Sequence, residues 1–189
     1  LNVAGPAAVE NKEQGVLISN LNYAAGNKAM EMSDFESAYL FFDHGISFLR
    51  KGHWRDHYDL SIKIFDAASK CAMIIHNFVG LKLLAEQIQI HAEDLDDKLN
   101  SIYYSLTALA YASHVPEVVN KSILVLSQLG EELPESYTES DMVFQVEQTK
   151  IVIEAFSDEE LLGYKTMENH SKRMAMKFYS RLILMFQMA

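Results

Sequence analysis

The chain has 189 residues, of which 49% are hydrophobic, and it contains only 8 Gly and 3 Pro. This length and content suffice for a sizeable core and argue against disorder, while the shortage of turn residues disfavours a β-sandwich and favours helices. The net charge of −10 argues against binding to nucleic acid or an anionic membrane, and no run approaches the roughly 18 apolar residues of a membrane span.

The first predicted element follows a short non-repetitive segment. Residues 1–15 are expected to be a linker or the end of a preceding element. From Val16 onwards apolar residues recur three and four positions apart, which predicts a helix. A polar break then places Asp34 as the N-cap of a second helix. Residues 16–52 therefore predict a helical hairpin.

Two further hairpins are predicted along the chain. Residues 57–93 show two helical runs, the second beginning at Phe78. Residues 96–130 show another pair, in which Pro116 opens the second helix and Gly130 is the C-cap. The region 16–134 is thus expected to be an all-α array of antiparallel helix hairpins.

The last part of the chain, residues 135–189, departs from this regular pattern. It predicts a helix over about 142–156, a short helix opened by a capping box at Ser157–Glu160, and a final helix over about 171–188. We expect these divergent helices to pack on the third hairpin. The chain begins with Leu and ends within an apolar run, so we expect it to be an excerpt in which the last helix is truncated.

Small and aromatic residues in the hairpins resemble those of the tetratricopeptide repeat, in which small residues allow close helix approach and aromatic residues fill the junctions. Gly26 and Ala38 are expected to form the close contact, and Gly45 to face the first helix of the next unit. The separation of the hairpins exceeds the ~34 residues of the typical repeat. The residues expected to pack the repeats are Gly26, Phe35, Ala38, Phe42, Gly45, Phe78 and Ala85.

No pattern in the sequence predicts catalysis, a cofactor or a metal. His53 and His57 lie four residues apart, but no third ligand follows in register. The carboxylates of residues 93–97 are typical of a helix start. Phosphate-binding loops are absent. The single cysteine, Cys71, lies in an apolar run and is expected to be buried, and one cysteine fits a reducing, intracellular compartment, with the cytoplasm expected.

Several stretches together resemble the helical region that follows the AAA-type ATPase module in very large multidomain kinase, ATPase and sensor signalling proteins. They are LNYAAGNKA, FESAYLFFDHGISFL, WRDHYDLSIKIFDAASKCA, HAEDLDDKLNSIY and VLSQLGEELP. The resemblance implies a tetratricopeptide-like segment without catalytic residues of its own, used in signal transduction for interdomain or partner recognition. A parent protein with ATP-dependent kinase or ATPase activity would carry its sites outside this stretch.

The predicted function is therefore protein–protein or interdomain interaction through a groove between the first helices of the pairs. Candidate groove residues are Asn22, Asn27, Lys63, Lys70, Tyr104 and Thr107. One alternative is a helical subdomain that completes a neighbouring nucleotide or kinase site through Arg50, Lys51 and Arg55 around Trp54. Another is a stand-alone peptide-binding adaptor, for which the net charge favours basic over acidic ligands.

Overall fold

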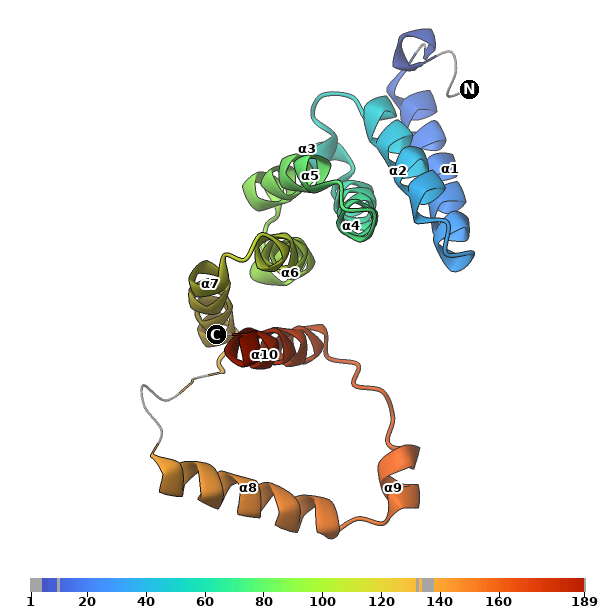
Figure 1. Cartoon of the computed structure of the whole chain (residues 1–189). Helices are drawn as coiled ribbons and strands as arrows, with labels where there is room; N and C mark the ends of the chain where they lie inside the picture. Colours follow the sequence, from blue (N-terminus) through green and yellow to red (C-terminus); the bar gives the residue numbers. More distant parts are fainter. Residues whose placement is uncertain (1–4, 10, 132, 134–137, 189) are drawn as a thin grey trace.

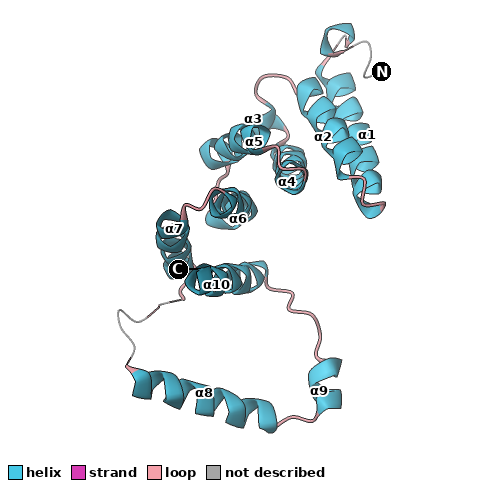
Figure 2. Ribbon diagram, in the orientation of Figure 1, coloured by secondary structure: helices cyan, strands magenta, loops and turns pink. Residues whose placement is uncertain are grey.

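A computed structural model describes residues 5–9, 11–131, 133 and 138–188 of the chain (Figures 1 and 2). These residues contain no strand, which confirms the all-helical prediction. They form a 3-10 helix, Pro6–Ala8, and ten α-helices: α1 (Lys12–Glu31), α2 (Phe35–Phe48), α3 (His53–Asp56), α4 (Tyr58–Ile74), α5 (Phe78–His91), α6 (Leu95–Tyr111), α7 (Val115–Gln128), α8 (Glu139–Glu154), α9 (Asp158–Gly163) and α10 (His170–Met188). No helix of the described part is long and apolar enough to cross a membrane.

Seven of the long helices pack in succession (Figure 1). Helix α1 packs against α2, α4 against α5, and α6 against α7. Neighbouring pairs are joined because α4 also contacts α1, α2 and α6, and because α10 packs against α6 and α7. One buried cluster is centred on Phe42 and Ile64, and another on Leu126 and Phe178. The fold is therefore a row of helix pairs with α10 at its end.

The three turns within the pairs share one backbone conformation. Ser33, His76 and Ser113 each have a left-handed φ, between 59° and 61°. In the first turn the backbone N–H of Asp34 donates to the carbonyl of Ala29 at 2.9 Å, and the other two turns repeat this bond. This is a Schellman turn, which satisfies helix-end carbonyls and reverses the chain in few residues. The repeated geometry explains why each pair is a tight hairpin.

Several predicted helix boundaries are confirmed. Asp34 caps α2 by accepting the backbone N–H of Ser37 at 3.1 Å. Gly130 has a left-handed φ of 78° after the end of α7. At the start of α9, Ser157 and Glu160 form the expected capping box. These boundaries were predictable because each depends on side chains or a glycine adjacent in sequence.

The prediction that residues 1–15 form a linker extends too far along the chain. Helix α1 begins at Lys12, because the side chain of Asn11 accepts the backbone N–H of Gln14 at 2.9 Å. Gly15 is buried in this first turn, and a Cβ at that position would lie 2.7 Å from the carbonyl oxygen of Phe48. The N-terminal turn of α1 therefore belongs to the first pair.

The expectation that all of residues 135–189 pack on the third hairpin is correct only for α10. Helices α8 and α9 lie outside the packed row, and each of their described side chains is exposed (Figure 1). Phe144 and Ile151 are seven residues apart on one side of α8, whereas Val146 and Ile153 occupy the nearly opposite side. With no single apolar stripe, α8 has no face suited to one-sided packing.

The close contacts of the first pair differ in one respect from those expected. A Cβ at Gly26 would lie 2.4 Å from the ring of Phe42, so Gly26 faces Phe42 rather than Ala38. Ala38 itself is fully buried. A Cβ at Gly45 would lie 2.5 Å from Cδ1 of Ile64, which places Gly45 against the first helix of the next pair. The aromatic ring on α2 fills the space that the glycine on α1 leaves.

The other expected packing residues lie at the starts and inner faces of second helices. Phe35 begins α2 and Phe78 begins α5, and both are partly buried. Phe35 packs on the cluster around Phe42, whereas Phe78 packs on a smaller cluster that includes Tyr104. Ala85 is buried on α5.

Candidate functional site

The first helices of the three pairs and α10 together enclose a groove, called here the central groove. Its volume is about 420 Å³. Each of these helices supplies lining residues, so the groove runs across the packed row rather than within one pair. It is lined by Tyr23, Asn27 and Met30 of α1, by Lys63, Asp66, Ala67 and Lys70 of α4, by Asn100 and Tyr104 of α6, and by His170, Arg173, Met174 and Lys177 of α10.

The charged side chains of the groove are mostly cationic. Lys63 and Lys70 lie one above the other on α4, and Arg173 and Lys177 do the same on α10. Within the described part of the chain none of these four forms an ion pair. A cleft lined by one sign of charge concentrates ligands of the opposite sign. The central groove is therefore a local basic site in an acidic chain.

The single carboxylate of the groove, that of Asp66, is largely withdrawn from solvent. Burial raises its pKa to about 6, although a hydrogen bond from Asn100 and the nearby charges of His170, Lys177 and Lys70 act in the opposite direction. The amide of Asn100 donates to Oδ2 of Asp66 at 3.2 Å, while Oδ1 is buried without a hydrogen-bond partner in the described structure. At neutral pH Asp66 is mostly ionised, so the groove has one carboxylate against its four Lys and Arg side chains.

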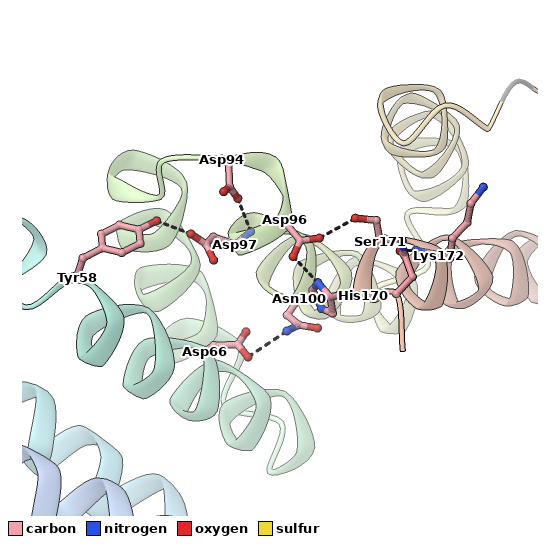
Figure 3. A network of polar contacts seen from close by, with 10 residues as sticks. Tyr58, Asp66, Asp94, Asp96, Asp97, Asn100, His170, Ser171 and Lys172 are labelled. Carbon is pink, nitrogen blue, oxygen red and sulfur yellow. Dashed lines mark hydrogen bonds and ion pairs between the residues drawn. The ribbon is translucent and has the colours of Figure 1, made fainter. Parts of the chain in front are cut away.

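The acidic start of α6 holds the helices around the groove in place (Figure 3). Asp94 caps α6 by accepting the backbone N–H of Asp97 at 3.0 Å. The side chain of Asp97 accepts the hydroxyl of Tyr58 on α4 at 2.6 Å. Asp96 accepts the hydroxyl of Ser171 on α10 at 2.8 Å and lies 2.9 Å from Nδ1 of His170. These carboxylates join α4, α6 and α10.

The structure brings four of the six predicted groove residues together. Asn27, Lys63, Lys70 and Tyr104 all line the central groove. Asn22 does not, because it is buried in the first pair, with a Cβ only 3.1 Å from where a Cβ at Gly45 would stand. Four of the predicted residues therefore line one cavity between the first helices of the pairs, whereas Asn22 lies outside it.

Thr107, the sixth predicted residue, is buried at the contact between α6 and α10. Its hydroxyl accepts a hydrogen bond from Nη2 of Arg181 at 2.6 Å and donates to the carbonyl of Tyr103 at 2.8 Å. The guanidinium of Arg181 also lies 5.2 Å from the centre of the Tyr103 ring. Thr107 therefore anchors α10 instead of lining the groove.

The basic turn around Trp54 is occupied by contacts within the chain. The guanidinium of Arg50 donates to the carbonyl of Val9, and Arg55 pairs with Asp56 at 2.8 Å. The Trp54 ring lies 4.9 Å from that of Phe65 and is partly buried. Such contacts favour a packing role for this turn over a nucleotide contact.

The remaining candidate residues also have local roles. His53 begins α3, and its Nδ1 lies 2.8 Å from the hydroxyl of Ser61. Cys71 is fully buried, as predicted, and burial raises the pKa of its thiol to about 11. In the part of the chain that the structure describes, no three His, Cys, Asp or Glu side chains gather in a way that could hold a metal ion.

Sequence reasoning missed the contribution of α10 to the groove. His170, Arg173 and Lys177 are separated from α7 by the 41 residues 129–169, and no local signal shows which helix lies beside them. A spacing of four residues between Arg173 and Lys177 was the available signal, since it places both on one side of a helix. The net charge of −10 averages over the whole surface, so it does not show a local cluster of cations.

Comparisons of this chain with protein families, with curated proteins and with solved structures find no match.

Proposed function

We propose that this chain is a non-catalytic, tetratricopeptide-like segment of an α-solenoid whose central groove binds an acidic protein segment. The observation that carries the proposal is the set of cations on α4 and α10, Lys63, Lys70, Arg173 and Lys177, none of which forms an ion pair in the described part of the chain. Such an arrangement suits an extended ligand that crosses several helices, as in helical-repeat proteins generally. The partner is a separate protein or a neighbouring domain of the same polypeptide, as the resemblance to ATPase-linked signalling proteins suggests.

The groove also offers groups that can hold a peptide backbone. Asn27 and Asn100 stand on the first helices of different pairs and carry both a donor and an acceptor. Met30, Ala67 and Met174 supply apolar surface beside them. Polar groups that fix orientation within a partly apolar cleft are typical of a binding site. The ligand class that fits best is a short peptide with several carboxylates.

The proposal is tested by fluorescence anisotropy with a labelled acidic peptide and with a basic peptide of equal length. We expect the acidic peptide to bind more tightly, and the substitution pair Lys63→Glu/Lys70→Glu, called here the groove variant, to weaken that binding by at least about tenfold. A control pair, Lys28→Glu/Lys82→Glu, changes the same net charge outside the groove and should leave affinity nearly unchanged. Raising the salt concentration should weaken the acidic complex steeply.

Two outcomes would contradict the proposal. One is an equal loss of affinity in the groove variant and in its control. That result would mean that the loss comes from the change in net charge and not from the groove. The other is tighter binding of a nucleotide than of any acidic peptide, which would support the alternative of a nucleotide-completing subdomain. Where charge reversal lowers the melting temperature, the milder pair Lys63→Gln/Lys70→Gln keeps the test valid, with a smaller expected loss.

A further inference from the structure

Helices α8 and α9 form an arm that the packed row leaves uncovered. The arm is defined as residues 138–163, and all of its described side chains are exposed. It carries large apolar side chains, among them Phe144 and Ile151, whose exposed fractions are 56% and 60%. Exposed apolar side chains that no other helix of the chain covers are available to a partner, and those of α8 lie on several sides of the helix rather than on one face. The arm therefore presents a surface suited to a partner.

The charge of the arm is opposite to that of the central groove. Its acidic residues outnumber its single cation, Lys150, and they are densest at the junction of α8 and α9. At that junction Glu154, Asp158, Glu159 and Glu160 lie within a stretch of seven residues that also contains the partly exposed ring of Phe156. The junction of the arm is thus acidic and partly apolar, which complements a basic groove that is also lined by methionines and an alanine.

The arm does not occupy the groove of its own chain. The chain on both sides of the arm reaches α10. Before the arm, the carboxylate of Glu131 lies 2.5 Å from Nζ of Lys172 and 3.2 Å from the hydroxyl of Tyr179. After the arm, residues 164–169 lead into α10 at His170. Between these two segments the arm extends away from the packed row (Figure 1). One copy therefore presents an open groove and an open arm at the same time.

We infer that the acidic junction of the arm of one copy docks in the central groove of a second copy, so that the chain associates head to tail. This inference rests on the proposed function, because it names the arm of a second copy as one acidic segment that the groove accepts. The groove volume of about 420 Å³ suits only a few side chains of this junction rather than the whole of α8. A heterologous contact of this kind joins two different surfaces and can continue from copy to copy.

The test measures self-association of the full chain by sedimentation velocity over a range of concentrations, at about 0.05 M and about 0.5 M salt. The wild-type chain should form larger species as its concentration rises, and high salt should reverse this. The triple substitution Glu154→Gln/Asp158→Asn/Glu159→Gln, called here the arm variant, should weaken association at least about tenfold. Glu160 is retained because it forms the capping box of α9.

Mixing two defective copies gives the decisive result. The arm variant retains a groove and the groove variant retains an arm, so together they should form a 1:1 complex although neither associates with itself. A control triple on the packed row, Glu31→Gln/Asp43→Asn/Glu86→Gln, removes the same charge and should self-associate as the wild type does.

Three results would overturn the inference: a wild-type chain that stays monomeric at all concentrations, association that persists in the arm variant, or no complex on mixing. A monomeric chain whose arm variant binds the acidic peptide more tightly would assign the arm to its own groove instead. Failure of the inference is distinguishable from failure of the proposed function. In the first case the chain still binds the added acidic peptide, whereas in the second the groove variant does not alter that binding.

Discussion

At the scale of single residues, close approach of helices depends on the smallest side chains. Gly26 leaves the space that the ring of Phe42 occupies, and Gly45 admits Ile64 of the next pair. The sequence predicted small residues at these places, but it assigned the wrong partner to Gly26. Helical spacing identifies which residues share a face, whereas the partner depends on how two helices are rotated against each other.

Replacing Ala38 by Leu should overpack the first pair. Ala38 is fully buried within the cluster around Phe42, so the added atoms have no free space. We expect the free energy of unfolding to fall by roughly 1–3 kcal/mol, measured by urea denaturation. The matched control is Ala24→Leu at an exposed position of α1, where we expect a change within about 0.5 kcal/mol. Equal effects at the two positions would contradict the assigned packing.

Replacing Asp66 by Asn should stabilise the protein in a pH-dependent manner. Burial raises the pKa of Asp66 from 3.8 to about 6, so the folded state resists its ionisation. The cost is absent well below pH 3.8, grows between the two values and is complete above pH 6. Asp66→Asn should therefore raise the free energy of unfolding by on the order of 1–3 kcal/mol at about pH 7.5 and by little at about pH 4.

Asp96 provides a control of opposite sign for this experiment. Burial disfavours its ionisation, but hydrogen bonds from Ser171 and His170 outweigh burial and lower its pKa. A lowered pKa contributes stability above the pKa of the unfolded chain, and that stability is lost as pH falls through the folded-state value. Asp96→Asn should therefore destabilise the protein at neutral pH. A stabilising Asp96→Asn, or an Asp66→Asn gain that does not change with pH, would refute this assignment.

At the scale of elements, the helix ends were easier to predict than helix packing. Asp34, Gly130 and the Ser157–Glu160 capping box act on neighbouring backbone groups, so the local sequence is sufficient. The start of α1 at Lys12 was missed because apolar periodicity begins only at Val16 and the capping role of Asn11 was not weighed. The exposure of α8 could have been anticipated, because its apolar residues are spread around the helix and form no single stripe.

The hairpin turns predict a stabilising substitution. Ser113 has a left-handed φ of 61°, a conformation that costs a residue with a Cβ roughly 1–2 kcal/mol. Ser113→Gly removes this strain and adds some unfolded-state entropy, so we expect a net gain of up to about 1 kcal/mol in thermal or urea unfolding. The preceding residue, Ala112, has a φ of −82°. Ala112→Gly should therefore destabilise, and a loss of stability in Ser113→Gly would show that the turn is not left-handed.

At the scale of the whole molecule, a groove between first helices could be predicted, but its charge could not. Asn27, Lys63, Lys70 and Tyr104 line it because hairpins that stack in one direction bring corresponding helices to one side. The cations of α10 join them only through tertiary packing across the long connection after α7. The chain has 26 acidic residues against 16 Lys and Arg, so its net charge does not reveal that a few cations gather in one cleft.

The most direct test of the central groove is lysine labelling by an acetylating reagent, read by mass spectrometry with and without an excess of acidic peptide. Binding in the groove should slow labelling of Lys63, Lys70 and Lys177 by at least about threefold, as expected for amines covered by a ligand. Lys28 and Lys82 are exposed outside the groove and should label at unchanged rates. Peptide that binds while protecting Lys28 and Lys82 as strongly as the groove lysines, or without protecting the groove lysines, would contradict the account.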